Sequence, residues 1–122
     1  MNNKMLGRWG EGIAAEFLRK KRYTIIGMGY RTRMGEIDVI AENKKYVVFV
    51  EVKLRRDNAF AEAREYVGAE KQRRIIAAAR HWLMCHDTEK QPRFDVVEVY
   101  APEGADTKKP TVNWYENAFW TE

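Results

Sequence analysis

Charged side chains stand where a central strand should be apolar, in residues 50–53 (Val-Glu-Val-Lys). A run of five apolar residues, 46–50, precedes Glu51. Because side chains at positions i and i+2 share one face of a strand, Glu51 and Lys53 point the same way as the apolar residues before them. A buried charge is costly unless it is paired or bound to a metal. The segment therefore indicates a catalytic or metal site, and the alternative is a strand that surfaces here with an ordinary Glu–Lys pair.

A second carboxylate, Asp38, lies on the preceding predicted strand, across a predicted turn at residues 43–44. If this turn is a two-residue loop, Asp38 lies opposite Phe49, and Glu51 is its diagonal neighbour within roughly 7–8 Å. A four-residue loop would instead place Asp38 directly opposite Glu51. In both registers Asp38, Glu51 and Lys53 project from one face, whereas a three-residue loop would separate them.

Two carboxylates this close repel each other, and they persist if a proton or a divalent cation lies between them. Hard oxygen ligands suit Mg²⁺ or Mn²⁺. A lysine two residues further on can orient or deprotonate a water molecule beside the metal. This arrangement fits the hydrolysis of a phosphodiester, because the metal must offset the charge of the transition state.

Glu11 is a candidate third carboxylate on a predicted N-terminal helix. Its neighbours on the helix surface are small or apolar, and the charged face of the helix lies elsewhere. A carboxylate in such surroundings could meet a metal or another part of the chain. The alternative is a partly exposed glutamate, which is favourable near a helix N-terminus.

Basic residues could hold the phosphates of a nucleic acid. Six bases and no acid lie between Phe17 and Gly35, and the whole chain carries 22 Lys and Arg against 18 Asp and Glu, a net charge of +4. This excess permits a polyanionic partner without requiring one, and a solvated basic face is the alternative. A helix N-terminus also attracts phosphate. The candidate phosphate-binding residues are Arg31, Arg33, Arg55, Lys71 and Gln72.

The elements that must position these residues follow from the spacing of apolar side chains. Spacings of three and four predict helices over 5–22 and about 69–86, the second with a stripe of Ile75, Ala79 and Trp82. Residues 23–34 are ambiguous, with a strand start, and 57–66 are poorly determined. Four strands are predicted, at 35–42, 45–54, 93–100 and 111–118. The strand over 45–54 is apolar on both faces, which favours a central place in a mixed α/β domain over residues 1–122.

Taken together, these segments resemble the YraN family of small bacterial proteins, which are predicted to be endonuclease-like. That family is similar to the PD-(D/E)XK nuclease superfamily and to archaeal Holliday-junction resolvases within it. The resemblance implies a restriction-endonuclease-like fold with a central mixed β-sheet flanked by α-helices. The motifs that carry it are Gly10-Glu11 with Ala14 and Ala15, residues 35–41 (GEIDVIA), residues 48–53 (VFVEVK) with Arg55, Val67 with Lys71, and residues 93–97 (RFDVV).

The resemblance also implies roles for individual residues. Asp38 and Glu51 would be metal ligands, Lys53 the catalytic lysine, and Glu11 the acid that resolvases carry on their first helix. Lys71 or Gln72 would be the polar residue on the helix after the core sheet. The implied activity is Mg²⁺- or Mn²⁺-dependent hydrolysis of DNA, branched or otherwise structured. The alternatives are a nuclease-fold protein that binds nucleic acid without cutting it and a protein-interaction module.

The remaining expectations concern the compartment and partners. Cys85 is the only cysteine, so no intramolecular disulfide can form, and a reducing cytoplasm is expected. No apolar stretch approaches the roughly 20 residues that span a bilayer, so no membrane partner is expected. Resolvase-like proteins often act as symmetric dimers, which makes a homodimer an expectation of the resemblance. No heptad pattern or apolar patch in the sequence identifies its interface.

Overall fold

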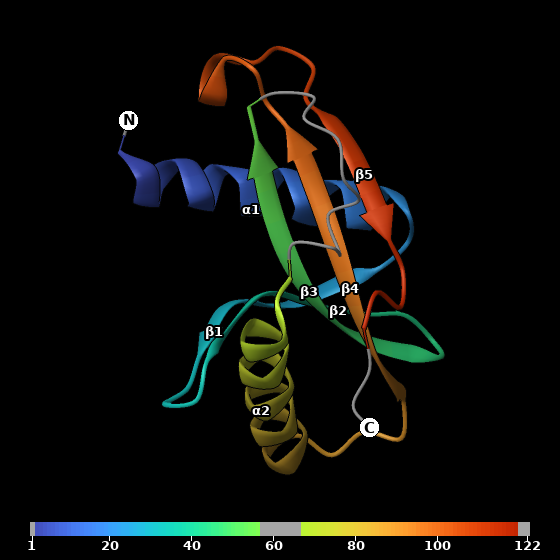
Figure 1. The fold of residues 1–122 in the computed structure, drawn as a ribbon. Coiled ribbons are helices and arrows are strands. Elements are labelled where there is room, and N and C mark those ends of the chain that lie inside the picture. The colour runs from blue at the N-terminus through green and yellow to red at the C-terminus, as the bar shows by residue number, and fades with distance from the viewer. Residues whose placement is uncertain (1, 57–66, 120–122) are drawn as a thin grey trace.

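The computed structural model describes residues 2–56 and 67–119. The predicted order of helices and strands is confirmed, and the ambiguous segment 23–34 contains a strand (Figure 1). The poorly determined segment 57–66 lies outside the described residues. The elements are α1 (Asn3–Lys20), β1 (Thr24–Arg31), β2 (Glu36–Glu42), β3 (Tyr46–Arg55), α2 (Ala69–Cys85), β4 (Gln91–Tyr100), the short 3₁₀ helix η2 (Gly104–Asp106) and β5 (Thr111–Tyr115).

The strands form one mixed sheet in the order β1-β2-β3-β4-β5. β3 and β4 run parallel, with α2 in the connection between them, and the other neighbours are antiparallel. β3 is central, as its two apolar faces predicted. This single α/β domain, with a mixed sheet and two helices, is consistent with the restriction-endonuclease-like fold that the resemblance implied.

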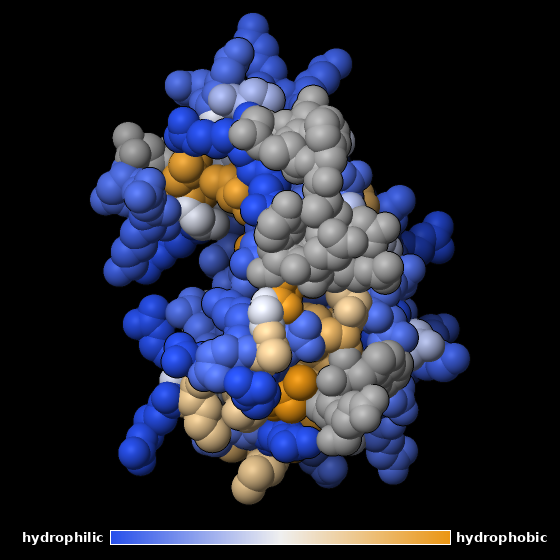
Figure 2. All heavy atoms as spheres, viewed as in Figure 1, coloured by the Kyte–Doolittle hydropathy of each residue, from blue (hydrophilic) through white to orange (hydrophobic). Residues whose placement is uncertain are grey.

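Alternate residues of β3 pack under different helices, and this divides the core in two. Val48 and Val50 pack in a cluster with Leu18 of α1, whereas Phe49 packs in a cluster with Trp82 of α2. The two helices therefore cover opposite faces of the sheet. The predicted α2 stripe is confirmed, since its three residues are buried. Hydrophilic side chains dominate the outer surface of the face drawn in Figure 2.

The turn between β2 and β3 corrects one prediction. The two-residue loop predicted at residues 43–44 is wrong, because the turn centres on Lys44 and Lys45. The Asn43 carboxamide oxygen accepts hydrogen bonds from the Lys45 and Tyr46 backbone N–H groups at 2.9 and 2.7 Å, and this side-chain cap moves the turn by one residue. Val39 then pairs with Val50. Continuing this register places Asp38 opposite Glu51, as the longer-loop alternative stated.

The RFDVV motif builds a buried structural network. The Arg93 guanidinium donates two hydrogen bonds to the Asp95 carboxylate, at 2.9 and 2.8 Å, and one to the Tyr23 hydroxyl at 3.0 Å. Asp95 also accepts from the Trp114 indole and the Asn117 backbone N–H, each at 2.9 Å. This network ties β4 to β5 and to the start of β1. Arg93 and Asp95 are thus fully occupied within the fold.

None of the helices in the described part of the chain is long and apolar enough to cross a membrane.

A close backbone approach joins the β1–β2 turn to α2 at Gly35. A Cβ built on Gly35 would lie 2.6 Å from the Arg74 carbonyl oxygen, a distance that real Cβ atoms do not tolerate. The Thr32 hydroxyl oxygen also accepts a hydrogen bond from the Gly35 N–H at 3.1 Å, which fixes the turn. Glycine at this position therefore lets the turn that precedes Glu36 and Asp38 dock on the helix that carries Lys71.

Gly35→Ala is expected to lower the free energy of unfolding by about 1–3 kcal/mol, because turn and helix must move apart. Gly12→Ala is the matched control, since a Cβ on Gly12 meets nothing within 4 Å and alanine favours the helix by about 0.5–1 kcal/mol. Denaturant unfolding measures both variants. A Gly35→Ala protein as stable as the parent would contradict the close approach.

Candidate active site

The candidate site centres on two carboxylates that face each other across β2 and β3. Asp38 is partly buried, and its Oδ2 accepts a hydrogen bond from the Val52 backbone N–H at 2.8 Å, which fixes it against β3. Glu51 is only 4% exposed. Its Oε1 is buried and has no hydrogen-bond partner among the described residues. Because a buried carboxylate oxygen without a donor is costly, this position favours a bound cation.

Both acids on the sheet and Glu11 on α1 share one electrostatic environment. Burial raises the pKa of Asp38 to about 8, and the Glu51 charge, a hydrogen bond between the Asp38 and Glu51 carboxyl groups and, more weakly, the Glu11 charge add to the rise, against the Val52 N–H. The pKa of Glu11 is also raised, first by burial and then by the charges of Glu36 and Glu51. A carboxyl group with a pKa near 8 holds a proton at neutral pH, and a divalent cation can take the place of that proton.

Two lysines pair with a single oxygen of Glu51. The Nζ of Lys53 lies 3.5 Å from Glu51 Oε2, and the Nζ of Lys71 lies 3.6 Å from the same atom. Lys53 comes from β3 itself and Lys71 from the first turn of α2, so two elements converge here. The lysines are 26% and 49% exposed, while Glu51 is buried. The alternative of a strand that simply surfaces at this point does not match a Glu51 that is as buried as the core.

Glu11 is near this pair but is not a third member of it. It lines a cleft of about 810 Å³ between α1 and the β1–β2 hairpin. Within residues 2–56 and 67–119, no three His, Cys, Asp or Glu side chains form a group that could hold a metal ion. The structure therefore brings Asp38 and Glu51 together and leaves Glu11 at the distance of an electrostatic neighbour.

Sequence reasoning missed Glu36, which lines the same cleft as Glu11. Its charge contributes to the raised pKa of Glu11. Its carboxylate also pairs with Arg31, whose Nη2 lies 3.1 Å from Glu36 Oε2. The signal for Glu36 was present in the sequence, since it stands two residues before Asp38 on the same strand.

The predicted phosphate-binding residues divide into two groups. Arg31, Arg33 and Lys71 line one cleft of about 460 Å³ between the β1–β2 turn and the start of α2. Arg55 lies at the end of β3, where its Nε is 3.4 Å from Oε2 of the buried Glu98. Gln72 donates a hydrogen bond to the Val67 carbonyl at 2.8 Å, next to the start of α2. The first three share a surface beside the carboxylates, and the other two do not.

The pair of acids fits a hard divalent cation. Mg²⁺ usually takes one or two protein carboxylates and fills its other positions with water and substrate phosphate. Asp38 and Glu51 supply two carboxylates, and Glu51 Oε1 is a buried oxygen without a donor among the described residues. Mn²⁺ accepts the same oxygen ligands.

Comparison with known proteins finds one family. The model of a family described as "Uncharacterised protein family UPF0102" matches residues 10–99. A UPF0102 protein of Alkaliphilus oremlandii is 41% identical over 120 residues, which is 96% of this chain and 99% of the relative. UPF0102 protein TTE1452 of Caldanaerobacter subterraneus subsp. tengcongensis is 41% identical over 121 residues, 98% of each chain. A UPF0102 protein of Syntrophotalea carbinolica is 46% identical over 95 residues, 77% of each chain.

The raised pKa of Asp38 predicts how stability depends on pH without metal. The folded state keeps a proton that the unfolded chain loses above its ordinary pKa of 3.8, so the free energy of unfolding falls as pH rises from about 4 to about 8. Asp38→Asn removes this penalty and keeps an oxygen that accepts from Val52. In EDTA the variant should exceed the parent by about 1–3 kcal/mol at pH 8, and the difference should vanish toward pH 4. Denaturant unfolding across this range tests it, and a difference independent of pH would contradict the assignment.

Proposed function

The chain belongs to the UPF0102 family, which is the YraN family that the sequence motifs resemble. We propose that it is a metal-dependent endonuclease that hydrolyses phosphodiester bonds in DNA. One observation carries the proposal, namely that the two oxygens of the buried Glu51 carboxylate differ in their partners. One of its oxygens is paired with Lys53 and Lys71, while the other has no hydrogen-bond partner in the described part of the chain. Without metal, a proton held by Asp38 eases the contact between the two carboxyl groups, and a divalent cation would take the place of that proton.

In this proposal Asp38 and Glu51 would hold Mg²⁺ or Mn²⁺, which when bound supplies a Lewis acid and lowers the pKa of a water molecule. The Lys53 ammonium would orient the attacking water and offset the charge that develops on the phosphate. Glu11, on α1, would accept hydrogen bonds from water in the cleft that it lines. Each of these roles requires no movement of the side chain away from its position in the free chain.

Lys71 would hold a phosphate oxygen beside the reacting group. It lies in the first turn of α2, where the helix N-terminus also favours an anion. Arg31 and Arg33 line the same cleft and would bind the flanking backbone. Because Arg31 pairs with Glu36 in the free chain, a phosphate would have to compete with that carboxylate.

The proposed substrate is branched or otherwise structured DNA. This choice follows from the resemblance of the YraN family to archaeal Holliday-junction resolvases, which also favours a symmetric dimer because a junction has paired strands to cut. The supporting feature on this chain is the arginine and lysine cleft directly beside the acid pair.

A second candidate function is the binding of nucleic acid without cleavage. It is favoured by the lack of a third metal-ligating side chain near Asp38 and Glu51 within the described residues. In that case the basic cleft would act as in the first proposal, and the acids would bind metal weakly. The two functions differ in turnover alone.

Nuclease assays on linear, flapped and four-way DNA with Mg²⁺ or Mn²⁺ test the proposal. Glu51→Gln and Lys53→Met should each lower the cleavage rate at least about a hundredfold, because each removes a group acting on the transition state. Glu16→Gln is the control, since Glu16 is an exposed acid on α1.

Metal-dependent cleavage that is equal in the parent and in Glu51→Gln would rule out this site. A parent protein that cuts none of the substrates but binds them with a steep salt dependence would establish the second candidate function instead.

A further inference from the structure

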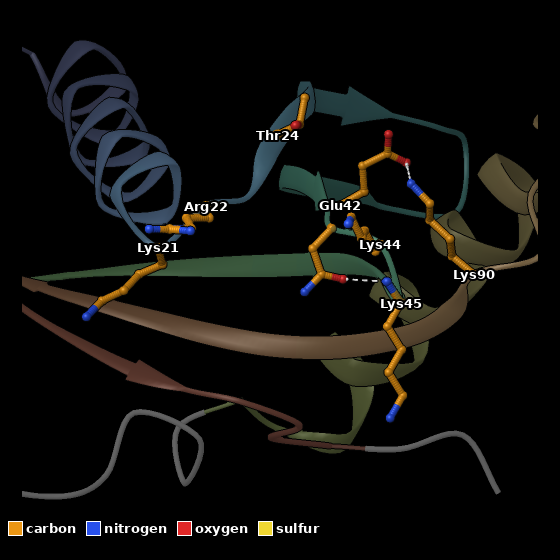
Figure 3. Close-up of a pocket in the computed structure, with 8 residues that line it drawn as sticks. Lys21, Arg22, Thr24, Glu42, Lys44, Lys45 and Lys90 are labelled. Carbon is orange, nitrogen blue, oxygen red and sulfur yellow. Dashed lines mark hydrogen bonds and ion pairs between the residues drawn. The ribbon is translucent and has the colours of Figure 1, made fainter.

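A second basic recess lies where β2 ends and β3 and β4 begin (Figure 3). It measures about 520 Å³ and lies between the end of α1, the start of β1 and the β2–β3 turn. The acid pair lies further along the same strands, at Asp38 and Glu51. At roughly 3.3 Å per residue, the six residues from Lys45 to Glu51 span roughly 20 Å. The recess is lined by Lys21, Arg22, Thr24, Glu42, Asn43, Lys44, Lys45 and Lys90.

Positive charge in this recess is largely without counter-charge. Lys90 pairs with Glu42, with 3.0 Å between Nζ and Oε1. Within the described residues the four other cations, Lys21, Arg22, Lys44 and Lys45, make no ion pair. Four unpaired cations around one recess repel one another, and they attract a polyanion.

Arg22 adopts a backbone conformation that glycine usually adopts after the end of a helix. The end of α1 is a Schellman motif, in which the Tyr23 N–H bonds the Leu18 carbonyl at 3.0 Å and the Arg22 N–H bonds the Arg19 carbonyl at 2.9 Å. The residue after the cap in this motif adopts positive φ and is usually glycine. Here it is Arg22, with φ of 70°. An arginine in this conformation costs stability relative to glycine, and we take this cost as support for a binding role of its side chain.

The side chains spread along the recess and do not meet at one point. In Figure 3, Lys21 extends from the end of α1, while Lys45 extends from the β2–β3 turn at the other side of the recess. Their ammonium groups lie over the rings of Phe17 and Tyr46, at 5.3 and 5.2 Å from the ring centres, which helps to hold them apart. A small anion needs donors that converge on it, whereas an extended chain of phosphates suits donors that are spread out.

We propose that this recess binds the sugar–phosphate backbone of DNA as a second contact site, separate from the acid pair. The roughly 20 Å along the strands corresponds to about six nucleotides at 3.4 Å each, so a DNA segment would need at least this length to contact both sites. The recess would add affinity and fix the position of the DNA, and it would take no part in the chemistry. The choice of DNA rests on the proposed function, while the anion site itself rests on the charges of the recess.

Binding of a labelled duplex and a four-way junction in EDTA, followed by fluorescence anisotropy between about 50 and 200 mM salt, tests the proposal. Lys44→Ala/Lys45→Ala should weaken binding about tenfold and lower the salt slope by about 1 to 2. The matched control is Lys108→Ala/Lys109→Ala, which removes two exposed adjacent lysines from the loop between η2 and β5. Equal affinities of the two double variants would overturn the proposal.

Arg22→Gly separates binding from folding at the same recess. Glycine suits the positive φ, so the melting temperature should equal or exceed that of the parent while DNA affinity falls severalfold. Undiminished affinity in this variant would count against the recess.

Calorimetric titration with inorganic phosphate and with a nucleoside triphosphate distinguishes a small-anion site. Saturable binding that Lys44→Ala/Lys45→Ala abolishes, with DNA affinity unchanged, would overturn the proposal. DNA binding that depends on the recess, in a protein that never cuts, would support this inference and overturn the endonuclease. If the Lys44→Ala/Lys45→Ala variant still cuts DNA and binds it with full affinity, the second contact site is overturned and the endonuclease is supported.

Discussion

The burial of the Glu51 carboxylate on the central strand is the constraint on which the site depends. A charge in this position must be offset, and among the described residues two lysines do so, both at the same oxygen. Asp38 faces it across the hairpin, and there burial and mutual repulsion raise the pKa of Asp38 to about 8. The fold thus holds two acids in a state that a divalent cation would relieve. The proposed metal-dependent hydrolysis of phosphodiesters rests on this arrangement.

The rest of the architecture serves to hold this pair and its neighbours in place. The Asn43 cap sets the register that brings Asp38 opposite Glu51, and a slip of one residue would turn Asp38 to the other face. Gly35 allows the β1–β2 turn to contact α2, and α2 in turn carries Lys71 to the acids. Elements distant in the sequence therefore meet at one site through close backbone contacts and not through one continuous motif.

Much of this arrangement could be predicted because strand alternation depends on local sequence. The shared face of Asp38, Glu51 and Lys53, the central place of β3 and the order of elements all follow from it. The exact position of the β2–β3 turn could not be predicted, because the hydrogen bonds of the Asn43 side chain move it one residue beyond the two-residue loop expected at 43–44. The ion pair between Arg55 and Glu98 could not be predicted from the sequence either, since it joins two parallel strands that are separated by a long connection.

The central claim is that Asp38 and Glu51 bind a divalent cation, and a crystal soaked in Mn²⁺ tests it most directly. Diffraction recorded on both sides of the manganese absorption edge locates the ion without regard to activity. The account predicts an anomalous peak between the two carboxylates that is lost in crystals of Glu51→Gln. Intact carboxylates with no peak at saturating Mn²⁺ would contradict the account.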